Sequence, residues 1–455
     1  MEVEIISKEY IKPSSPTPPN LKTHKLSFLD QFIPTLYVPI ILFFPMNQST
    51  EHSVADIVSQ RSRLLKQSLS ETLTRFYPFA GKVKDTLSID CNDEGVYYVE
   101  ARVNCHLLEC LNQPNTALFY QFLCGEALRK ELTAGDHVAM IQASTFACGG
   151  IAIGVLVSHM IADGTGMSVF LKGWATTAHK AREAVLLCPN FDAPSVFIQN
   201  DAPSREVSYT LDALFNPFLK SGRFISRRVV FDASAIASLK AKATSPSVQN
   251  PTRVEVVSAL LWKCVMAAFK ATSGIHMPTF IIHPVNFRRR AIPPFSESSM
   301  GNLIWPALAS CTVEEIKLPD TVCKLREAIT KIDGDFVKSL QGDGGFAKHF
   351  ELAKEMVEAC ASEASSSGMN YIAFTSWCNF GLYDIDFGWG KPIWISSAGS
   401  SGNTEAVLPN LVLLMDTRSR DGIEAWVILD KEDMIVLGQD KELLAFASFD
   451  TSPIN

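Results

Sequence analysis

The chain has 455 residues, of which 47% are hydrophobic and 20% are charged. A chain of this length exceeds what one hydrophobic core usually holds, so we expect two domains, and the hydrophobic share excludes disorder on the scale of a domain. The net charge of −7 excludes the broadly basic surface that binds nucleic acid. The one dense basic cluster, Arg288-Arg289-Arg290, is large enough only for a phosphorylated small molecule.

The cysteines and the first residues indicate the compartment. The 11 cysteines are an odd number and form no CxxC pair, so we expect reduced thiols in a cytosolic protein and neither a zinc site nor a dithiol redox site. The acidic start MEVEIISKEY is atypical of a signal peptide. The most apolar early run, residues 32–45, is broken by Pro34 and Pro39 and is shorter than the roughly 20 residues of a membrane-spanning helix. We therefore expect a cytoplasmic protein without a membrane span, and a buried strand in this run.

The first half of the chain alternates helix and strand patterns. Apolar residues recur at helical spacing over residues 56–76, and residues 137–160 are rich in Val, Ile and Thr. Gly149-Gly150 marks the turn between two of the strands. In chain order we expect a helix over 56–76, a strand over 95–104, two strands within 137–160 and a helix over 166–181.

Residues 189–225 change in character, because prolines and polar residues occur there without sustained periodicity. Such a stretch is typical of a crossover between domains. We therefore predict an N-terminal domain over 1–195, a linker over 196–225 and a C-terminal domain over 226–455. In the last of these we expect a strand over 226–233, helices over 236–243 and 253–271, a strand over 279–288, and strands alternating with glycine-rich turns from Tyr371. The expected fold class is mixed α/β with large sheets.

The stretch VSHMIADGTG, residues 157–166, places a histidine at the expected end of a strand and an aspartate four residues later. A lone histidine beside a turn is more often an ordinary packed or exposed residue. His159 can nevertheless project into a cleft, where its ordinary pKa of about 6.5 suits removal of a proton from a hydroxyl group. Asp163 could hold the imidazole as the third member of a relay, or pair with an arginine and fix the loop. The spacing alone leaves both roles open.

A second motif, YDIDFGWGKP at residues 383–392, sets an aspartate at the head of a glycine-rich turn. Asp386-Phe387-Gly388 alone could indicate the magnesium loop of a kinase. The chain has neither the HRD catalytic loop nor the GxGxxG loop of kinases, so that interpretation fails. It also has no Walker A sequence and no GxSxG elbow.

Together the two motifs resemble the signatures of the plant BAHD acyltransferases, HxxxDG and DFGWG. HMIADG at 159–164 and DFGWG at 386–390 match without substitution and in the expected order, and the resemblance covers the whole chain. The HHxxxDG motif of bacterial peptide-synthetase condensation domains fits less well, because Ser158 replaces its first histidine and no carrier domain is attached. Further matches to the BAHD pattern are YPFAGK at 77–82, SALLW at 258–262, VNFRRRAIPP with MGN within 285–302, and TSW at 375–377.

The resemblance implies a fold and a mechanism. It implies two α/β domains similar to chloramphenicol acetyltransferase, each with a mixed sheet, that form a solvent channel between them. Acyl-CoA enters from one face and the acceptor from the other. His159 is then the general base in a ternary complex without a covalent acyl-enzyme, and acyl-CoA is a co-substrate, with no permanently bound cofactor and no metal.

The resemblance also implies roles for other residues. The Trp377 indole and the Thr375 hydroxyl are candidate donors to the oxyanion. Asp163, with Gly164, keeps the shape of the loop by pairing with an arginine, which we take to be Arg288. Asp386 organises its own turn and is more structural than catalytic. Coenzyme A contacts are expected from Ser258, Arg288, Arg290 and Asn302, and Arg289 is expected in a solvated surface loop.

The start IKPSSPTP followed by HKLSFLDQ most resembles the vinorine synthase-like clade of the family, whose members acetylate alkaloid or terpenoid alcohols. We therefore expect an acetyl-CoA:alcohol O-acetyltransferase of plant specialised metabolism that works as a monomer, although O- and N-acylation are not separated by the sequence. Cys378-Asn379-Phe380 stands where hydroxycinnamoyl-transferring relatives have an arginine, which disfavours shikimate or quinate as acceptor. Alternatives are a hydroxycinnamoyl or benzoyl transferase, and a non-catalytic BAHD-like partner in lipid elongation. The intact DFGWG favours an enzyme.

Overall fold

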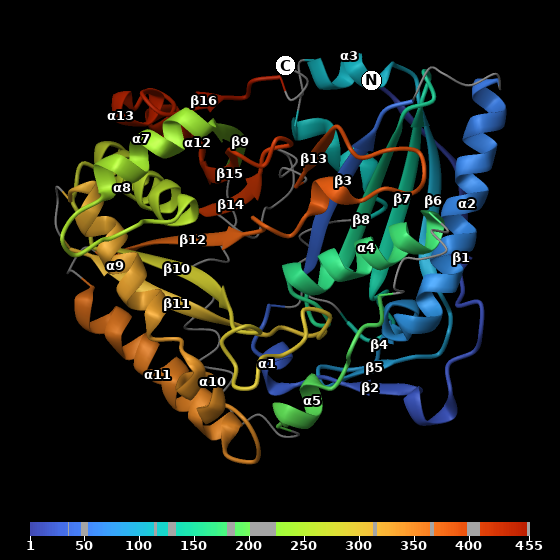
Figure 1. Ribbon diagram of the computed structural model, residues 1–455, viewed down its shortest axis with the longest axis horizontal. Coiled ribbons are helices and arrows are strands. Elements are labelled where there is room, and N and C mark those ends of the chain that lie inside the picture. The colour runs from blue at the N-terminus through green and yellow to red at the C-terminus, as the bar shows by residue number, and fades with distance from the viewer. Residues whose placement is uncertain are drawn as a thin grey trace.

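The computed structural model of the chain describes all residues except 35, 47–52, 113–115, 126–132, 180–186, 201–223, 313–315, 365–367, 398–409 and 453–455. The described residues form two large sheets that lie side by side and are covered by helices (Figure 1). A small third sheet joins β2 (Thr23–Lys25), β5 (Ser88–Asp90) and β4 (Lys82–Val83). The expected mixed α/β class with two sheet-rich halves is confirmed. The solvent channel between the halves stays a prediction.

The first sheet has six strands in the order β1-β6-β7-β8-β3-β13. β6 and β7 are parallel and all other neighbours are antiparallel, so the sheet is mixed. β8, with the uncharged sequence IAIGVLVS, is buried over its whole length and leads directly into the HMIADG motif. The bounds are β1 (Val3–Ile11), β6 (Val96–Val103), β7 (Ala139–Phe146), β8 (Ile151–Ser158), β3 (Tyr37–Phe44) and β13 (Trp394–Ser396).

Helices α2 (Val54–Arg75) and α4 (Gly164–His179) pack against each other and cover the first sheet (Figure 1). In α2 the buried residues Leu65, Leu69 and Leu73 recur every four positions, which places them on one face of the helix. The indole nitrogen of Trp174 in α4 donates to the carbonyl of Leu65 at 3.2 Å. This contact holds α4, which begins directly after the HMIADG motif, in place against α2.

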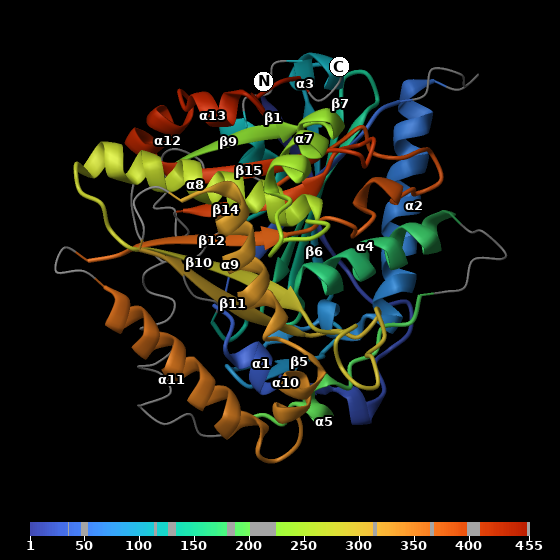
Figure 2. The ribbon, with the colours of Figure 1, turned by 60° about the vertical axis from the view of Figure 1, so that its left-hand side comes forward.

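The second sheet has seven strands in the order β11-β10-β12-β14-β15-β9-β16. Helices α7, α8, α9 and α12 pack on one face of it (Figure 2). The strands are β11 (Ile304–Cys311), β10 (Thr279–Asn286), β12 (Asn370–Ser376), β14 (Leu411–Asp416), β15 (Ile423–Asp430), β9 (Phe224–Phe231) and β16 (Ser448–Phe449). The four helices are α7 (Ala233–Ala243), α8 (Arg253–Ser273), α9 (Leu318–Thr330) and α12 (Lys431–Leu437), and the other α-helices are α1 (Phe28–Gln31), α3 (Leu107–Asn112), α5 (Ala193–Val196), α10 (Gly334–Ser339), α11 (Gly345–Glu363) and α13 (Lys441–Leu444).

One short strand of the C-terminal half belongs to the first sheet. β13 pairs with β3, and its Trp394 lies opposite Phe43. The Trp394 indole nitrogen also donates to the Glu424 carboxylate of the second sheet at 3.3 Å, and Glu424 forms a buried ion pair with Arg228 at 2.6 Å. The boundaries at 195 and 226 stay predictions, since most of the predicted linker lies outside the described residues. The interlocking strand shows that the two halves are not independent units.

Most expected elements are present. The helix expected over 56–76 is α2, the strand over 95–104 is β6, and the pair within 137–160 is β7 and β8. The helix expected from 166 begins two residues earlier, as α4. The expectations missed the edge strand β1, the strand β11 and several short elements, among them the one-turn helix α1. Helix α1 begins at a capping box formed by Ser27 and Asp30.

Candidate active site

The strand β8 ends at Ser158, and His159 is the first residue beyond it. The His159 backbone nitrogen donates to the Leu36 carbonyl at 2.8 Å, which fixes the main chain where the strand ends. The ring nitrogen Nδ1 is buried and has no hydrogen-bond partner among the described residues. Burial lowers the pKa of His159, and its own backbone, the charge of Asp163, the Asn302 side chain and the charge of Asp30 partly oppose that effect. The imidazole is therefore neutral at pH 7, which is the form that accepts a proton.

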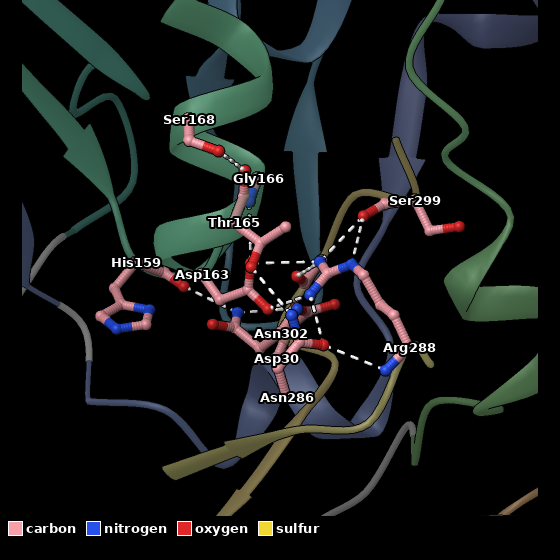
Figure 3. A network of polar contacts seen from close by, with 11 residues as sticks. Asp30, His159, Asp163, Thr165, Gly166, Ser168, Asn286, Arg288, Ser299 and Asn302 are labelled. Atoms are coloured by element: carbon pink, nitrogen blue, oxygen red, sulfur yellow. Dashed lines mark hydrogen bonds and ion pairs between the residues drawn. The ribbon is translucent and has the colours of Figure 1, made fainter. Parts of the chain in front are cut away.

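Asp163 points away from the imidazole and toward Arg288 (Figure 3). One carboxylate oxygen accepts a hydrogen bond from the Gly166 backbone nitrogen at 2.8 Å and from Arg288 Nη2 at 3.1 Å. The other oxygen accepts from Arg288 Nη1 at 2.7 Å. Of the two roles that the spacing left open, the geometry thus supports the ion pair with an arginine. Asp163 also caps the first turn of α4, so it fixes both the loop and the helix that follows.

Arg288 is completely buried and its guanidinium is surrounded by acceptors. Besides Asp163, it donates to the Ser299 carbonyl at 2.8 and 3.0 Å, to the Gly301 carbonyl at 3.2 Å and to Asn286 Oδ1 at 3.3 Å. Because these residues come from the C-terminal half, Arg288 attaches the HMIADG loop to the second half of the molecule. These bonds use Nε, Nη1 and Nη2, so the expected contact between Arg288 and a coenzyme A phosphate does not fit its surroundings.

The other expected coenzyme A contacts do not meet on one surface. Ser258 and Asn302 are completely buried, and the Ser258 hydroxyl has no partner among the described residues. Arg290 is half-buried and its Nη1 donates to two carbonyls beside the end of α9, at 2.6 and 2.9 Å. Arg289 is exposed and pairs with Glu297 at 2.5 Å, as expected of a surface loop. Arg290 stays a predicted coenzyme A contact. Ser258 and Asn302 are enclosed by the protein, as expected of residues that support the fold.

The TSW segment meets the HMIADG loop at Gly164. A Cβ atom at Gly164 would lie 2.9 Å from the indole nitrogen of Trp377 and 2.8 Å from the ring of Phe380, so only glycine allows this approach. The Trp377 indole N–H makes no hydrogen bond to any residue that the structure describes. Thr375 is two positions earlier on β12, on the same face of the strand, and is half-buried. A free indole N–H beside the histidine loop suits an oxyanion donor.

Asp386 has a local role. Its Oδ1 accepts hydrogen bonds from the backbone nitrogens of Gly388 at 2.7 Å and Gly390 at 2.9 Å. Both glycines have positive φ angles, of 101° and 111°, which disfavour other residues. Phe387 packs on Trp174 of α4 with 4.9 Å between ring centroids. The turn therefore supports the helix that follows HMIADG.

Sequence reasoning missed one residue of the site, Asp30. Its Oδ1 accepts from the Asn302 backbone nitrogen and from Asn302 Nδ2, both at 2.8 Å, and the same Nδ2 donates to the His159 carbonyl at 2.8 Å (Figure 3). The signal was available, because Ser27-Phe28-Leu29-Asp30 has the spacing of a capping box. The box places the carboxylate, and the fold brings Asn302 to it.

Neither a membrane-spanning helix nor a metal-binding cluster occurs among the described residues. No helix there is both long and apolar enough to cross a membrane. No group of three or more His, Cys, Asp or Glu side chains there could hold a metal ion.

Known proteins are similar to the chain over all or nearly all of its length. A model described as the Transferase family matches residues 1–444. An epi-neemfruitin B 7-O-acetyltransferase of Melia azedarach is 53% identical over 462 residues, and a limonoid 7-O-acetyltransferase of Citrus sinensis is 52% identical over 467 residues. Each alignment covers 100% of both chains. The crystal structure of vinorine synthase superposes with a TM-score of 0.81 at 34% identity, covering 100% of both chains.

Proposed function

The chain belongs to the Transferase family of BAHD acyltransferases, and we propose that it transfers the acetyl group of acetyl-CoA to a hydroxyl group of a terpenoid or alkaloid alcohol. The two limonoid O-acetyltransferases that are more than half identical to it support a limonoid-type alcohol as the first acceptor to test. The monomeric state and the cytoplasmic location expected from the sequence remain predictions.

The observation that carries the proposal is the pair of unpartnered groups at the HMIADG loop. The neutral imidazole of His159 lies at the end of a buried strand, and the free indole N–H of Trp377 reaches the same loop at Gly164. A general base and an oxyanion donor brought to the same loop are what acyl transfer requires. Asp163 and Arg288 keep the loop in this shape.

The reaction follows from these two groups. His159 removes the proton from the acceptor hydroxyl as its oxygen attacks the thioester carbonyl. The carbonyl oxygen becomes an oxyanion, to which Trp377 donates a hydrogen bond. When the tetrahedral intermediate collapses, the carbon–sulfur bond breaks and the coenzyme A thiolate takes the proton from the imidazolium. The products are an acetate ester and free coenzyme A, and no covalent acyl-enzyme forms.

The proposal is tested with the purified chain, acetyl-CoA and a panel of limonoid, other terpenoid and alkaloid alcohols. Release of the coenzyme A thiol and the mass of the acetylated alcohol are measured together. His159→Ala should lower kcat by roughly 10²- to 10⁴-fold, the range that a general base contributes. His106→Ala is the matched control, because this histidine is exposed in an N-terminal loop. Wild-type turnover by His159→Ala would refute the mechanism.

The donor panel separates the alternatives. Malonyl-, benzoyl- and p-coumaroyl-CoA are offered beside acetyl-CoA, and we expect acetyl-CoA to give the highest kcat/KM. Preference for an aromatic donor would favour a benzoyl or hydroxycinnamoyl transferase. Failure to bind or turn over any acyl-CoA would favour the non-catalytic partner in lipid elongation.

A further inference from the structure

Two buried polar atoms without partners lie next to each other at the site. Nδ1 of His159 and Oδ1 of Asn302 are both shielded from solvent, and neither makes a hydrogen bond of standard geometry to a described residue. In Figure 3 the side-chain amide of Asn302 is directed toward the imidazole of His159. Buried donors and acceptors are normally paired, because leaving one unpaired is costly.

The amide of Asn302 has one orientation. Its Nδ2 lies 2.8 Å from Asp30 Oδ1 and 2.8 Å from the His159 carbonyl oxygen, and both of these atoms are acceptors. Exchanging nitrogen and oxygen would set an amide oxygen against two other oxygens, so the flipped amide is excluded. The atom that remains for the imidazole is therefore the amide oxygen.

Asp30 holds this amide from the opposite side. Its Oδ2 accepts hydrogen bonds from the Ser27 nitrogen at 2.9 Å and the Ser27 hydroxyl at 2.6 Å, and its Oδ1 accepts two from Asn302. Burial raises the pKa of Asp30 and these four hydrogen bonds oppose that effect. The side chain is almost completely buried, and no basic side chain pairs with it among the described residues. A buried carboxylate without a counter-ion that orients one amide suggests a positioning task.

We propose that Asn302, oriented by Asp30, accepts a hydrogen bond from Nδ1–H of His159 and thereby leaves the Nε2 lone pair as the catalytic base. The inference rests on the proposed function, in which His159 is the base. A neutral amide takes the position that a carboxylate occupies in a Ser-His-Asp triad, while Asp163 is committed to Arg288. Asn302 and Asp30 act through the histidine and are positioning residues.

The bond has a measurable consequence for pH dependence. An acceptor at Nδ1 stabilises the imidazolium, so its loss should lower the pKa of His159 further. The charged groups that face the site are Asp163, Asp30 and Arg288, and Asn302→Ala leaves all three in place. Activity is lost when the base becomes protonated, so the acidic limb of kcat/KM should move to lower pH in Asn302→Ala.

The kinetic test compares the wild type with three variants. Asn302→Ala should lower kcat about 10- to 100-fold, the range of one hydrogen bond to a charged group, with KM for acetyl-CoA within about 3-fold. Asp30→Asn keeps the shape of the side chain but cannot accept all four hydrogen bonds. It should shift the acidic limb of kcat/KM in the same direction, and it replaces Asn302→Ala if that variant does not fold. Asn286→Ala is the control, because it removes hydrogen bonds to Thr165 and Arg288 in the same network but away from the imidazole. It should leave the acidic limb of kcat/KM in place.

A spectroscopic measurement tests the hydrogen bond between His159 and Asn302 without a measurement of turnover. In ¹⁵N-histidine NMR of the full chain, the His159 signal is identified by its absence in His159→Ala. We expect protonated Nδ1 and unprotonated Nε2 in the wild type, and a mixture of tautomers in Asn302→Ala. This inference alone would be overturned if Asn302→Ala kept the wild-type tautomer and the wild-type acidic limb of kcat/KM while His159→Ala was inactive. An active His159→Ala variant would instead overturn the proposed function.

Discussion

The two signature motifs each contain an aspartate, and the two aspartates differ in what they hold. Asp163 is 2% exposed and its carboxylate meets a completely buried guanidinium from a residue 125 positions away. Asp386 is half-buried and accepts two hydrogen bonds from glycines within four residues of itself. The first aspartate connects the two halves of the molecule, and the second closes one turn. A signature motif thus shows that a residue matters to the fold without showing how much free energy depends on it.

The two motifs also meet on one helix. Asp163 caps the N-terminus of α4, while Phe387 of the second motif packs on Trp174 near the other end of that helix. Both motifs therefore determine where His159 lies, one directly and one through α4. Substitutions in each motif separate these contributions.

Asp163→Asn should be the most harmful substitution. It leaves the buried Arg288 guanidinium without a counter-charge, and breaking one partner of a buried pair costs about 3–5 kcal/mol. We expect a loss of that size in the free energy of unfolding, measured by urea denaturation followed by circular dichroism. The double variant Asp163→Asn/Arg288→Met removes the unpaired charge and should recover part of the loss. A single variant as stable as the wild type would show that the pair does not hold the halves together.

The sequence predicted those features of the site that depend on local pattern. The strand end before His159 follows from the glycines after it, and the helix after Asp163 follows from its apolar spacing. The arginine partner of Asp163 came from the resemblance to a family. Family motifs did not reveal that Arg288 is completely buried, because burial depends on how the loop that contains Ser299 and Gly301 folds over it.

The parts that could not be predicted depend on contacts between distant segments. Asn302 and Asp30 are 272 positions apart, and no local spacing indicates their pairing. Strand β13 has only three residues, and it joins the first sheet because its apolar side chains are buried beside β3. Helix α1 was missed for a different reason: it is only one turn long, which is too short for helical spacing of apolar residues to show.

Asp386→Ala should have a much smaller effect than Asp163→Asn. It removes one acceptor of two backbone hydrogen bonds at a half-buried turn, which is worth about 1 kcal/mol. We expect a loss of that size in urea denaturation and a modest fall in kcat through the position of α4. Asp386→Asn keeps an acceptor oxygen and should lose less. A loss from Asp386→Ala as large as that from Asp163→Asn would remove the distinction between the two aspartates.

The pH dependence of activity gives the most sensitive comparison. Because burial lowers the pKa of His159, the acidic limb of kcat/KM should lie below the 6.5 of an ordinary histidine. The charge of Asp163 partly opposes that shift. Asp163→Asn removes a negative charge and leaves Arg288⁺ unpaired, and both changes disfavour the imidazolium, so the limb should move to still lower pH. Asp386→Asn should leave the limb unmoved, since Asp386 acts on the backbone of its own turn. The measurement is kcat/KM as a function of pH for the folded Asp163→Asn and Asp386→Asn variants. Equal shifts of the acidic limb in the two variants would mean that the second motif also affects the protonation of His159.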